Sequence, residues 1–344
     1  MKLRPRALAG IALAATAALG LSACGGSAST EPSEDPNALV VYNAQHESLT
    51  KEWIEEFTAE TGIKVVYRQG SDTEMSNQII QEGANSPADV FLTENSPAMT
   101  QVENAGLFAD VDAATVAQVP AEYRPSTGKW TGIAARSTLF VYNKEKLAEK
   151  DLPASLLDLQ KPEWKDRWAA SPSGADFQAI VSALLESKGE EATAAWLKGM
   201  KENSKAYKGN ITAMKAVNAG EVDAAVIYHY YYYGDQNKTG ENSDKVGTHY
   251  FKNQDPGAFV SISGGGVLAS SDKQEQAQAF LKYITGKKGQ AVLQNGTSFE
   301  YPVGSKVPAH EKLVPLKDLE APKIDPAKLN SQKVTELMTE AGIL

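Results

Sequence analysis

The chain has 344 residues, with 43 aspartate and glutamate residues against 34 lysine and arginine residues, and a formal net charge of −9. This acidic balance argues against nucleic-acid binding, because a protein that binds phosphate backbones needs a basic surface. With a single cysteine the chain cannot form an internal disulfide bond, so its hydrophobic core has to hold the fold, and a chain of about 300 residues can supply one.

Residues 1–24 have the pattern of a secretion signal. Three basic residues precede an apolar stretch, 7–21, that is shorter than the roughly 20 residues a membrane helix needs. The Leu-Ser-Ala-Cys sequence at its end resembles a bacterial lipoprotein signal and places Cys24 at the acylated position. We expect lipidated Cys24 to anchor the chain to the outer face of the cell membrane, with 25–37 as a flexible tether.

From residue 39 the chain alternates between short apolar runs and helical patterns, which predicts a parallel sheet with right-handed crossovers. Ligands of open α/β sheets bind beyond the carboxyl ends of the strands. His46 and Glu94 each follow a predicted strand end and are therefore candidate binding residues. The predicted strands are 39–42, 63–67 and 88–92, and the predicted helices run from Ser48 to a stop at Gly62 and from Asp72 to Gly83.

A long strand, 136–143, is placed to cross between two lobes, and a second α/β unit follows it. Ser173 and Gly174 open a helix there, and the free N–H groups of a helix start suit an anion, although an ordinary N-cap would use the same residues. The three glycines 264–266 are interpreted as tight backbone near the hinge. Helices are predicted over 177–187, 190–200, 211–219, 274–284 and 330–338, with a return crossing over 255–263.

The most unusual stretch follows the predicted strand 223–227. Five tyrosines and one histidine occupy positions 228–233, before Gly234 is expected to break the chain. A phenol has a pKa of about 10 and loses its proton to a strong Lewis acid, so these tyrosines are candidate phenolate ligands for a hard trivalent metal. Aromatic side chains that pack, stack on a ligand or line a lobe interface would explain the stretch equally well. We interpret His229 as a neighbour of the ligands, and His249 and His310 as surface residues.

Together these motifs resemble the ferric-ion-binding proteins of bacterial iron ABC importers, over about residues 39–303. The resemblance implies an α/β fold of two lobes, the type II periplasmic-binding-protein fold with crossing strands at its hinge. It implies a first lobe of 38–136 and 262–312 and a second lobe of 137–261 and 313–344. The matching motifs are Val41–His46, Ser86–Phe91 with Glu94, Ser173–Ala175, Asp223–Ala225 leading to Tyr230–Tyr231, Asp255–Ala258 and Glu300–Pro302.

Carried over residue by residue, the family's metal ligands fall on His46, Glu94, Tyr230 and Tyr231. The resemblance also implies a synergistic anion, phosphate or carbonate, in the remaining positions. Two departures leave the anion's identity open, because Tyr228 stands where an asparagine is common and Asn95 where a glutamine is common. By resemblance, the residues that contact the anion are Ser173, Gly174, Ala175 and Asn210, with Arg136 as a helper.

This donor set suits Fe(III), since two phenolates and one carboxylate supply three negative charges and a hard ion prefers oxygen. The resemblance implies an extracytoplasmic binding protein, and not an enzyme, that closes on Fe(III) and delivers it to a membrane-embedded ABC permease with its ATPase. We expect a monomer that contacts the membrane only through its lipid. Two alternatives stay open: a binding protein of the same fold for a phosphonate, thiamine or a polyamine, and a hydrolase, which no catalytic motif supports.

Overall fold

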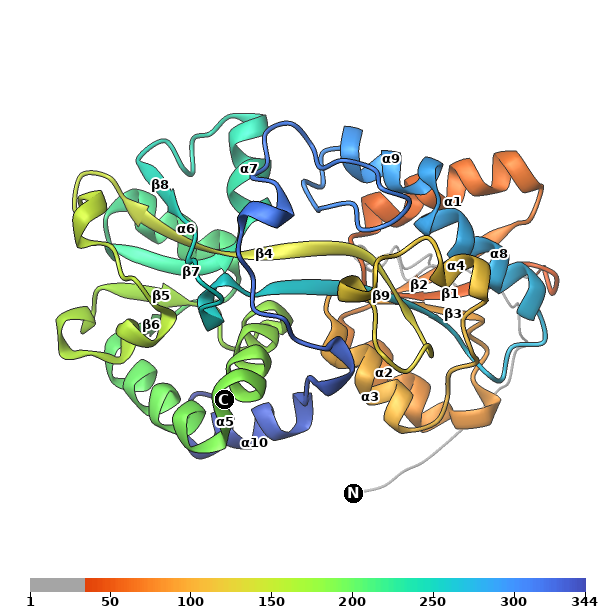
Figure 1. The fold of residues 1–344 in the computed structure, drawn as a ribbon, viewed down its shortest axis with the longest axis horizontal. Coiled ribbons are helices and arrows are strands. Elements are labelled where there is room, and N and C mark those ends of the chain that lie inside the picture. The colour runs from red at the N-terminus through yellow and green to blue at the C-terminus, as the bar shows by residue number, and fades with distance from the viewer. Residues whose placement is uncertain (1–34) are drawn as a thin grey trace, which may run out of the picture.

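The computed structural model describes residues 35–344. The predicted signal, Cys24 and residues 25–34 of the predicted tether lie outside this range. Among the residues that are described, no helix combines the length and apolar character needed to cross a membrane. The described chain folds into two α/β lobes connected by two long strands (Figure 1).

The first lobe confirms the predicted alternation of strands and helices. Strand β1 pairs in parallel with β2 on one side and with β3 on the other. Helix α1 buries Leu49, Trp53 and Phe57 and ends at Gly62, whose positive φ of 73° closes the last turn. The elements of this lobe are β1 (Leu39–Asn43), β2 (Val65–Gln69), β3 (Val90–Leu92), α1 (Glu47–Thr61), α2 (Asp72–Glu82), α3 (Ser96–Asn104), α4 (Ala113–Val116), α8 (Gln274–Thr285) and α9 (Lys287–Asn295).

The second lobe has its own strands and helices. The two helices predicted over 177–187 and 190–200 form one long element that is interrupted at Gly189, where φ is 81°. The prediction that Gly234 breaks the chain is wrong, because Gly234 lies inside a helix that begins at His229. The elements of this lobe are β5 (Trp168–Ala170), β6 (Ser204–Ala206), β7 (Ala224–Tyr228), β8 (Val246–His249), α5 (Ala175–Asn203), α6 (Asn210–Ala219), α7 (His229–Lys238) and α10 (Ser331–Glu340).

Two crossing strands, β4 (Thr131–Asn143) and β9 (Val260–Val267), connect the lobes. All thirteen residues of β4 are buried. Its first part pairs with β9 and its second part with β7 and β8, so one strand belongs to both lobes. β4 begins five residues before the predicted start at Arg136 because Thr131–Ala135 also pair with β9. The lobe boundaries expected at 136 and 262 fall within these strands and remain a prediction.

The glycines 264–266 belong to β9, one of the two crossing strands, and the close packing around them confirms their interpretation as tight backbone. A Cβ atom on Gly264 would lie 2.3 Å from the Cγ of Met99, and one on Gly265 would lie 2.7 Å from a methyl group of Leu281. Packing against α3 and α8 therefore requires glycine here, because any side chain would displace the core.

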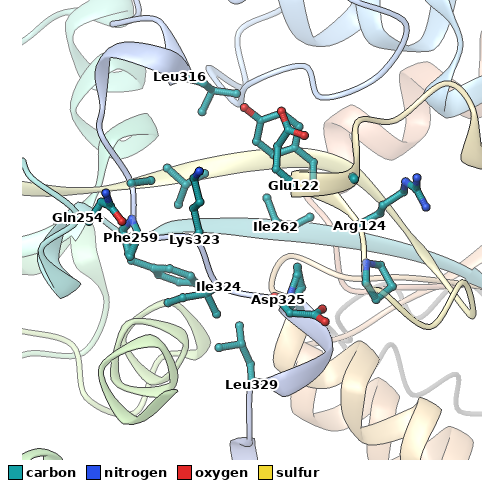
Figure 2. Close-up of a pocket in the computed structure, with 18 of the residues that line it drawn as sticks. Glu122, Arg124, Gln254, Phe259, Ile262, Leu316, Lys323, Ile324, Asp325 and Leu329 are labelled. Atoms are coloured by element: carbon teal, nitrogen blue, oxygen red, sulfur yellow. The ribbon is translucent and has the colours of Figure 1, made fainter. Parts of the chain in front are cut away.

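The crossing strands have two different faces. On β9, the hydroxyls of Ser261 and Ser263 face the polar cleft between the lobes, where they bond to Asn95 and to the Glu94 carbonyl. Val260 and Ile262, the alternating residues, line a cavity of about 1130 Å³ (Figure 2). Because successive strand residues point to opposite faces, the cleft and this cavity lie on opposite sides of β9.

Candidate metal centre

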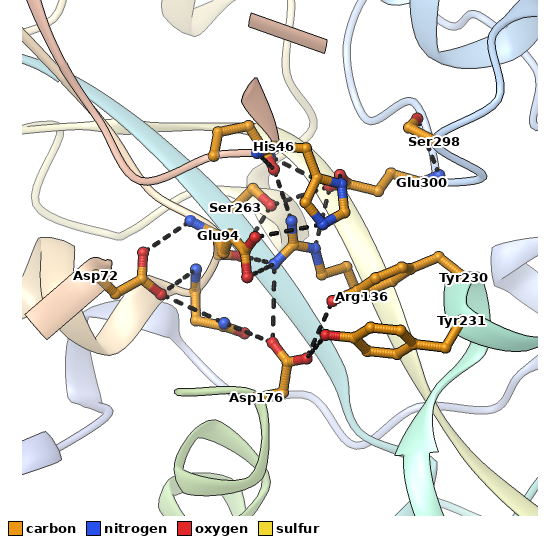
Figure 3. Close-up of polar contacts among 12 residues, drawn as sticks. His46, Asp72, Glu94, Arg136, Asp176, Tyr230, Tyr231, Ser263, Ser298 and Glu300 are labelled. Atoms are coloured by element: carbon orange, nitrogen blue, oxygen red, sulfur yellow. Dashed lines mark hydrogen bonds and ion pairs between the residues drawn. The ribbon is translucent and has the colours of Figure 1, made fainter. Parts of the chain in front are cut away.

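The four predicted ligands come from three different strand ends and meet in the cleft (Figure 3). His46 is the N-cap of α1, three residues beyond the end of β1, and Glu94 lies two residues beyond the end of β3. Tyr230 and Tyr231 lie in the first turn of α7, immediately after β7. His46 Nε2 lies 3.3 Å from Glu94 Oε1, and the rings of His46 and Tyr230 are 4.9 Å apart edge to face. The structure thus brings the predicted residues of both lobes together.

The two tyrosines are neighbours in space as well as in sequence. Their ring centroids are 4.1 Å apart. Tyr228, at the end of β7, is completely buried, with its hydroxyl 3.4 Å from the side-chain oxygen of Asn95. Tyr232 and Tyr233 pack against each other, and Tyr233 stacks on Phe299. The beginning of a helix at His229 therefore separates the aromatic positions: Tyr230 and Tyr231 turn to the cleft, Tyr228 reaches Asn95 from the end of β7, and Tyr232 and Tyr233 pack in the lobe.

Sequence reasoning missed Asp176, which lies in the first turn of α5. Its Oδ2 accepts hydrogen bonds from the hydroxyls of Tyr230 at 3.0 Å and Tyr231 at 3.1 Å. Oδ2 also accepts from Asn210 at 2.9 Å, and Oδ1 accepts from Asn95 at 3.0 Å. An acidic residue in a first helical turn is also a common response to the helix dipole, so the sequence held no distinctive signal.

Sequence reasoning also missed a role for Glu300, although this residue lies in one of the motifs that carry the family resemblance. Its carboxylate is completely buried and contacts His46 Nδ1 at 3.0 Å and Arg136 Nε at 3.1 Å. Burial opposes the charge, but Arg136 and His46 outweigh it and lower the pKa of Glu300 to about 2. An ionised Glu300 orients the imidazole from the side opposite Glu94. This is the usual arrangement of a carboxylate behind a metal-binding histidine.

Arg136, on β4, lies at the centre of the polar network. It is fully buried, and its Nη1 lies 3.2 Å from Glu94 Oε2 and 3.9 Å from Asp176 Oδ1. Its Nη2 donates to Gln45 Oε1 at 2.6 Å. Carboxylates from both lobes therefore surround a single guanidinium. Arg136 was predicted to help bind an external anion, but in the structure it is already paired with carboxylates of the protein.

A buried aspartate, Asp72, supports this network from behind. Asp72 Oδ1 accepts from the backbone N–H of Glu94 at 2.9 Å, and Oδ2 accepts from that of Asn95 at 3.0 Å. These bonds hold the chain after β3 so that Glu94 points into the cleft. Burial, with a contribution from Glu94, raises the pKa of Asp72 to about 8. Asp72 is the first residue of α2, a position from which the sequence indicated no contact with the cleft.

The carboxylates of this network outnumber its one arginine, and their charges affect the protonation of the four candidate ligands. Burial, together with the nearby charges, raises the pKa of Glu94. Burial and Asp176 raise the pKa of Tyr230 and Tyr231 above the ordinary phenol value, so both phenols are neutral in the metal-free protein. Burial disfavours a charged His46, but Glu300 and Glu94 outweigh it and raise its pKa. A cation entering the cleft would relieve the repulsion and displace these protons.

The predicted anion-contacting residues surround the start of α5 and α6. Ser173 is exposed, Gly174 is the N-cap of α5 and Ala175 is its first residue. Asn210 is buried at the start of α6 and donates to Asp176. A protein carboxylate thus occupies part of the space that the sequence assigned to an anion. The contact of these residues with an external anion remains a prediction.

The other histidines have structural partners. His229 accepts from Ser137 N–H at Nδ1 and lies 2.7 Å from the Phe299 carbonyl through Nε2. Burial lowers its pKa to about 4, so the ring is neutral and holds α7 against its neighbours. His249 is half-buried and bonds to the Pro153 carbonyl at 3.0 Å, so its interpretation as a surface residue is wrong. His310, also half-buried, packs on Phe299.

The two phenols of the cleft enlarge its set of possible metal ligands. In the part of the chain that the structure describes, no three His, Cys, Asp or Glu side chains are arranged to hold a metal ion by themselves. Adding the two phenols to His46 and Glu94 makes a set of mostly oxygen donors, with Asp176 touching both phenols. Such a set suits a hard trivalent ion.

Comparison with known proteins gives one matching family model and three similar proteins. A family model described as bacterial extracellular solute-binding protein matches residues 85–329. The chain is 64% identical to the Fe(3+)-binding periplasmic protein of Serratia marcescens over 344 residues, which is 100% of both chains. It superposes on iron-bound HitA from Pseudomonas aeruginosa with a TM-score of 0.83 and 39% identity, covering 89% of this chain and 99% of that one. A Trichodesmium protein in complex with iron and citrate ligands gives a TM-score of 0.77 and 27% identity, covering 89% and 100%.

Proposed function

The chain belongs to the ferric-iron-binding periplasmic proteins among the bacterial solute-binding proteins, and we propose that it binds Fe(III) through His46, Glu94, Tyr230 and Tyr231. Proteins of this family bind Fe(III) outside the cytoplasm and deliver it to a permease, and they are not enzymes. The assignment of the four ligands to this chain is our proposal. The observation that supports it is the convergence of a histidine and a glutamate from one lobe with two adjacent phenols from the other.

The charges of the site fit a ferric ion. Two phenolates and Glu94 supply three negative charges, and Asp176 and the ionised Glu300 add two more, one of which Arg136 offsets. We infer that Asp176, released from its two phenol hydrogen bonds when those protons leave, contributes a further oxygen donor to the ion. An external anion, phosphate or carbonate, would then compete with Asp176 for Asn210 and the start of α5. Citrate, which accompanies iron in the Trichodesmium structure, is a third candidate for that place.

The candidate ligands come from both lobes, so binding of one ion would close the lobes. His46 and Glu94 belong to strand ends of the first lobe, while both tyrosines and Asp176 belong to helix starts of the second. An ion that binds all of them favours the closed arrangement, because those contacts exist only when the lobes meet. We propose that the permease, with its ATPase, recognises this closed form of a monomer.

Attachment to the membrane is a separate proposal. Cys24 lies outside the described residues, and its lipidation rests on the sequence alone. We propose that acylated Cys24 holds the binding protein beside its permease. A Cys24→Ser chain should appear in the soluble extracytoplasmic fraction, whereas the unaltered chain should sediment with membranes. Equal distribution of the two chains would contradict a lipid anchor at this residue.

The experiment that tests iron binding uses the full chain carrying Cys24→Ser, so that no lipid is attached. We expect metal analysis after incubation with ferric citrate to give one iron per chain. We also expect a visible charge-transfer band, because phenolate bound to Fe(III) absorbs there and a phosphonate, thiamine or polyamine complex does not. A colourless protein in excess ferric citrate would reject the ferric assignment of this cleft.

A further inference from the structure

A cavity of about 1130 Å³ lies behind the crossing strands, outside the candidate metal centre (Figure 2). It shares no residue with the candidate metal centre, and β9 separates the two. Ligand sites in proteins are mostly concave and apolar, with a few polar groups and volumes of about 300–1,000 Å³. At about 1130 Å³ the cavity slightly exceeds this range, so it has room for a small molecule together with water.

Three segments that are far apart in the sequence build its walls. They are the loop 121–126 before β4, the pair Asn253 and Gln254 before β9, and the C-terminal segment 316–329, which passes over the crossing strands (Figure 1). Hydrogen bonds tie the last two together, because Glu320 accepts from Gln254 N at 2.9 Å through its carbonyl and from Asn253 N at 3.0 Å through Oε2. The opening is thus lined by fixed backbone.

This wall is formed at a conformational cost. Asn253, Gln254 and Glu320 all have positive φ, at 57°, 57° and 54°. Residues other than glycine rarely adopt this conformation, and such strain is concentrated at functional sites. Three strained residues that bond to one another at the rim of a single cavity indicate that the shape of the rim is required. The strain supports the cavity as a site but does not identify its ligand.

The lining identifies the chemistry of the ligand. The floor is apolar, and it is formed by Phe259, Val260, Ile262, Leu316, Ile324 and Leu329. Arg124, Lys317 and Lys323 contribute cations to the rim, and none has an ion pair with the residues that the structure describes. Of the carboxylates in the lining, Glu320 bonds to Asn253, and Asp325 accepts from Ala327 N and Ser126 N. The lining therefore holds three carboxylates and three cations, but Glu320 and Asp325 already accept hydrogen bonds, whereas the side chains of Lys317 and Lys323 have no polar partner among the described residues.

We propose that this cavity is a second ligand site, which takes a small organic anion with an aromatic or branched aliphatic body. The body would lie on the apolar floor, and its carboxylate or sulfonate would face Lys323 and Arg124. Both rim cations can reach a ligand from the solvent side because Lys323 is exposed and Arg124 is partly exposed. A polar metabolite without an apolar body would leave the floor in contact with water.

The position of the cavity makes it an effector site for iron binding, a step that rests on the proposed function. Ser96 and Arg124 line it from the first lobe's side, and Asn253 and Gln254 from the second lobe's side. A ligand that touches both sides binds differently when the lobes move. The cavity is present in the arrangement in which His46 meets Tyr230, so its occupant and iron favour the same state. By linkage, each should then tighten the binding of the other, typically by about fivefold or more.

The test uses 8-anilinonaphthalene-1-sulfonate, an aromatic sulfonate whose fluorescence rises in apolar sites, with the full chain carrying Cys24→Ser. We expect saturable binding of one probe per native chain, at least about fivefold tighter after iron loading. Lys323→Glu should lower the affinity for the probe several-fold. Ala121→Trp, which fills the cavity from its exposed edge, should abolish probe binding. Lys328→Glu is the matched control, since Lys328 is an exposed lysine of the same segment outside the lining.

The outcomes separate this inference from the iron assignment. Absence of saturable probe binding to the metal-free chain would overturn the inference, whatever happens with iron. The inference would also fail if Lys323→Glu and Lys328→Glu bound the probe equally well, or if iron loading left the probe's affinity unchanged. A chain that binds the probe but shows no visible iron band would instead count against the ferric site. Thermal unfolding of each variant checks that the fold is intact.

Discussion

The hydroxyl of Tyr230 donates to Asp176 Oδ2 at 3.0 Å, across the gap between the start of α7 and the start of α5. Tyr231 donates to the same oxygen at 3.1 Å. In the metal-free site both phenols are therefore neutral, and both donate a hydrogen bond to the same carboxylate oxygen. If Tyr230 and Tyr231 bind Fe(III) as phenolates, as proposed, the ion replaces both of these protons, which links its uptake to proton release.

Replacing either cleft tyrosine should remove most of the visible colour. Tyr230→Phe and Tyr231→Phe each delete one phenolate, so we expect the charge-transfer band of the ferric protein to lose most of its intensity and iron affinity to fall by at least about tenfold. Tyr233→Phe is the control, because Tyr233 stacks on Phe299 away from the cleft. Absorption spectra of the iron-loaded variants measure the loss. Full colour in both cleft variants would show that other side chains hold the ion.

Acid should release iron from a pH close to neutral. The pKa of His46 is raised by Glu300 and Glu94, and that of Glu94 by burial, and both groups must lose their protons to bind the ion. Affinity should therefore fall as the pH drops through each pKa, by up to about tenfold per pH unit for each proton taken up. Titration of the visible band from about pH 8 to about pH 4 measures this release.

Glu300→Gln should move that acid release to lower pH. The substitution removes the carboxylate that most raises the pKa of His46, so the imidazole stays neutral further into the acid range. Glu47→Gln is a control beside the site, since Glu47 pairs with Lys51 on the surface. An identical release midpoint in Glu300→Gln and the unaltered chain would contradict the role given to Glu300.

Asp72 should matter for iron although it cannot touch the ion directly from behind the backbone of Glu94. Asp72→Asn replaces one of the two acceptor oxygens by an amide N–H₂ group, which then faces a backbone N–H group. The backbone that positions Glu94 loses a hydrogen bond, so we expect iron affinity to fall about 10- to 100-fold. Asp89→Asn is matched, because Asp89 is also a buried aspartate that accepts a backbone N–H, from Val40 at 2.7 Å, but far from the cleft. Competition with citrate measures both variants. Equal iron affinity in the two would refute a positioning role for Asp72.

The glycines of β9 should be intolerant of any side chain. A Cβ on Gly265 would meet Leu281 at 2.7 Å and Ile133 at 2.9 Å, so Gly265→Ala should destabilise the fold by about 1–3 kcal/mol. Gly234→Ala should be neutral or stabilising by up to about 1 kcal/mol, because nothing lies within 4 Å of its Cβ position and it is inside a helix. Urea unfolding compares the two, and a smaller loss for Gly265→Ala than for Gly234→Ala would contradict the packing argument.

Sequence patterns predicted the parts of this protein that depend on neighbours along the chain. The apolar runs and helical spacing located β1, β3 and α2, and the order of strands and helices implied which ends carry the binding residues. The placement of His46 and Glu94 after strand ends follows from the same rule. The ferric-binding family was recognised from the motifs at these positions, and the relatives confirm it.

Folding decided the contacts between segments that are distant in sequence. Gln45 and Glu300 bond across 255 residues, and Asn95 reaches Asp176 across 81. No local periodicity encodes such a pair, because a buried carboxylate is stabilised by whichever partners the packed lobes bring to it. The separation of Tyr230 and Tyr231 from the other tyrosines likewise depends on where α7 begins, and the cavity behind β9 on how the C-terminal segment returns. The chain therefore supplies the donor types by itself, whereas only the tertiary structure determines which of them face one ion.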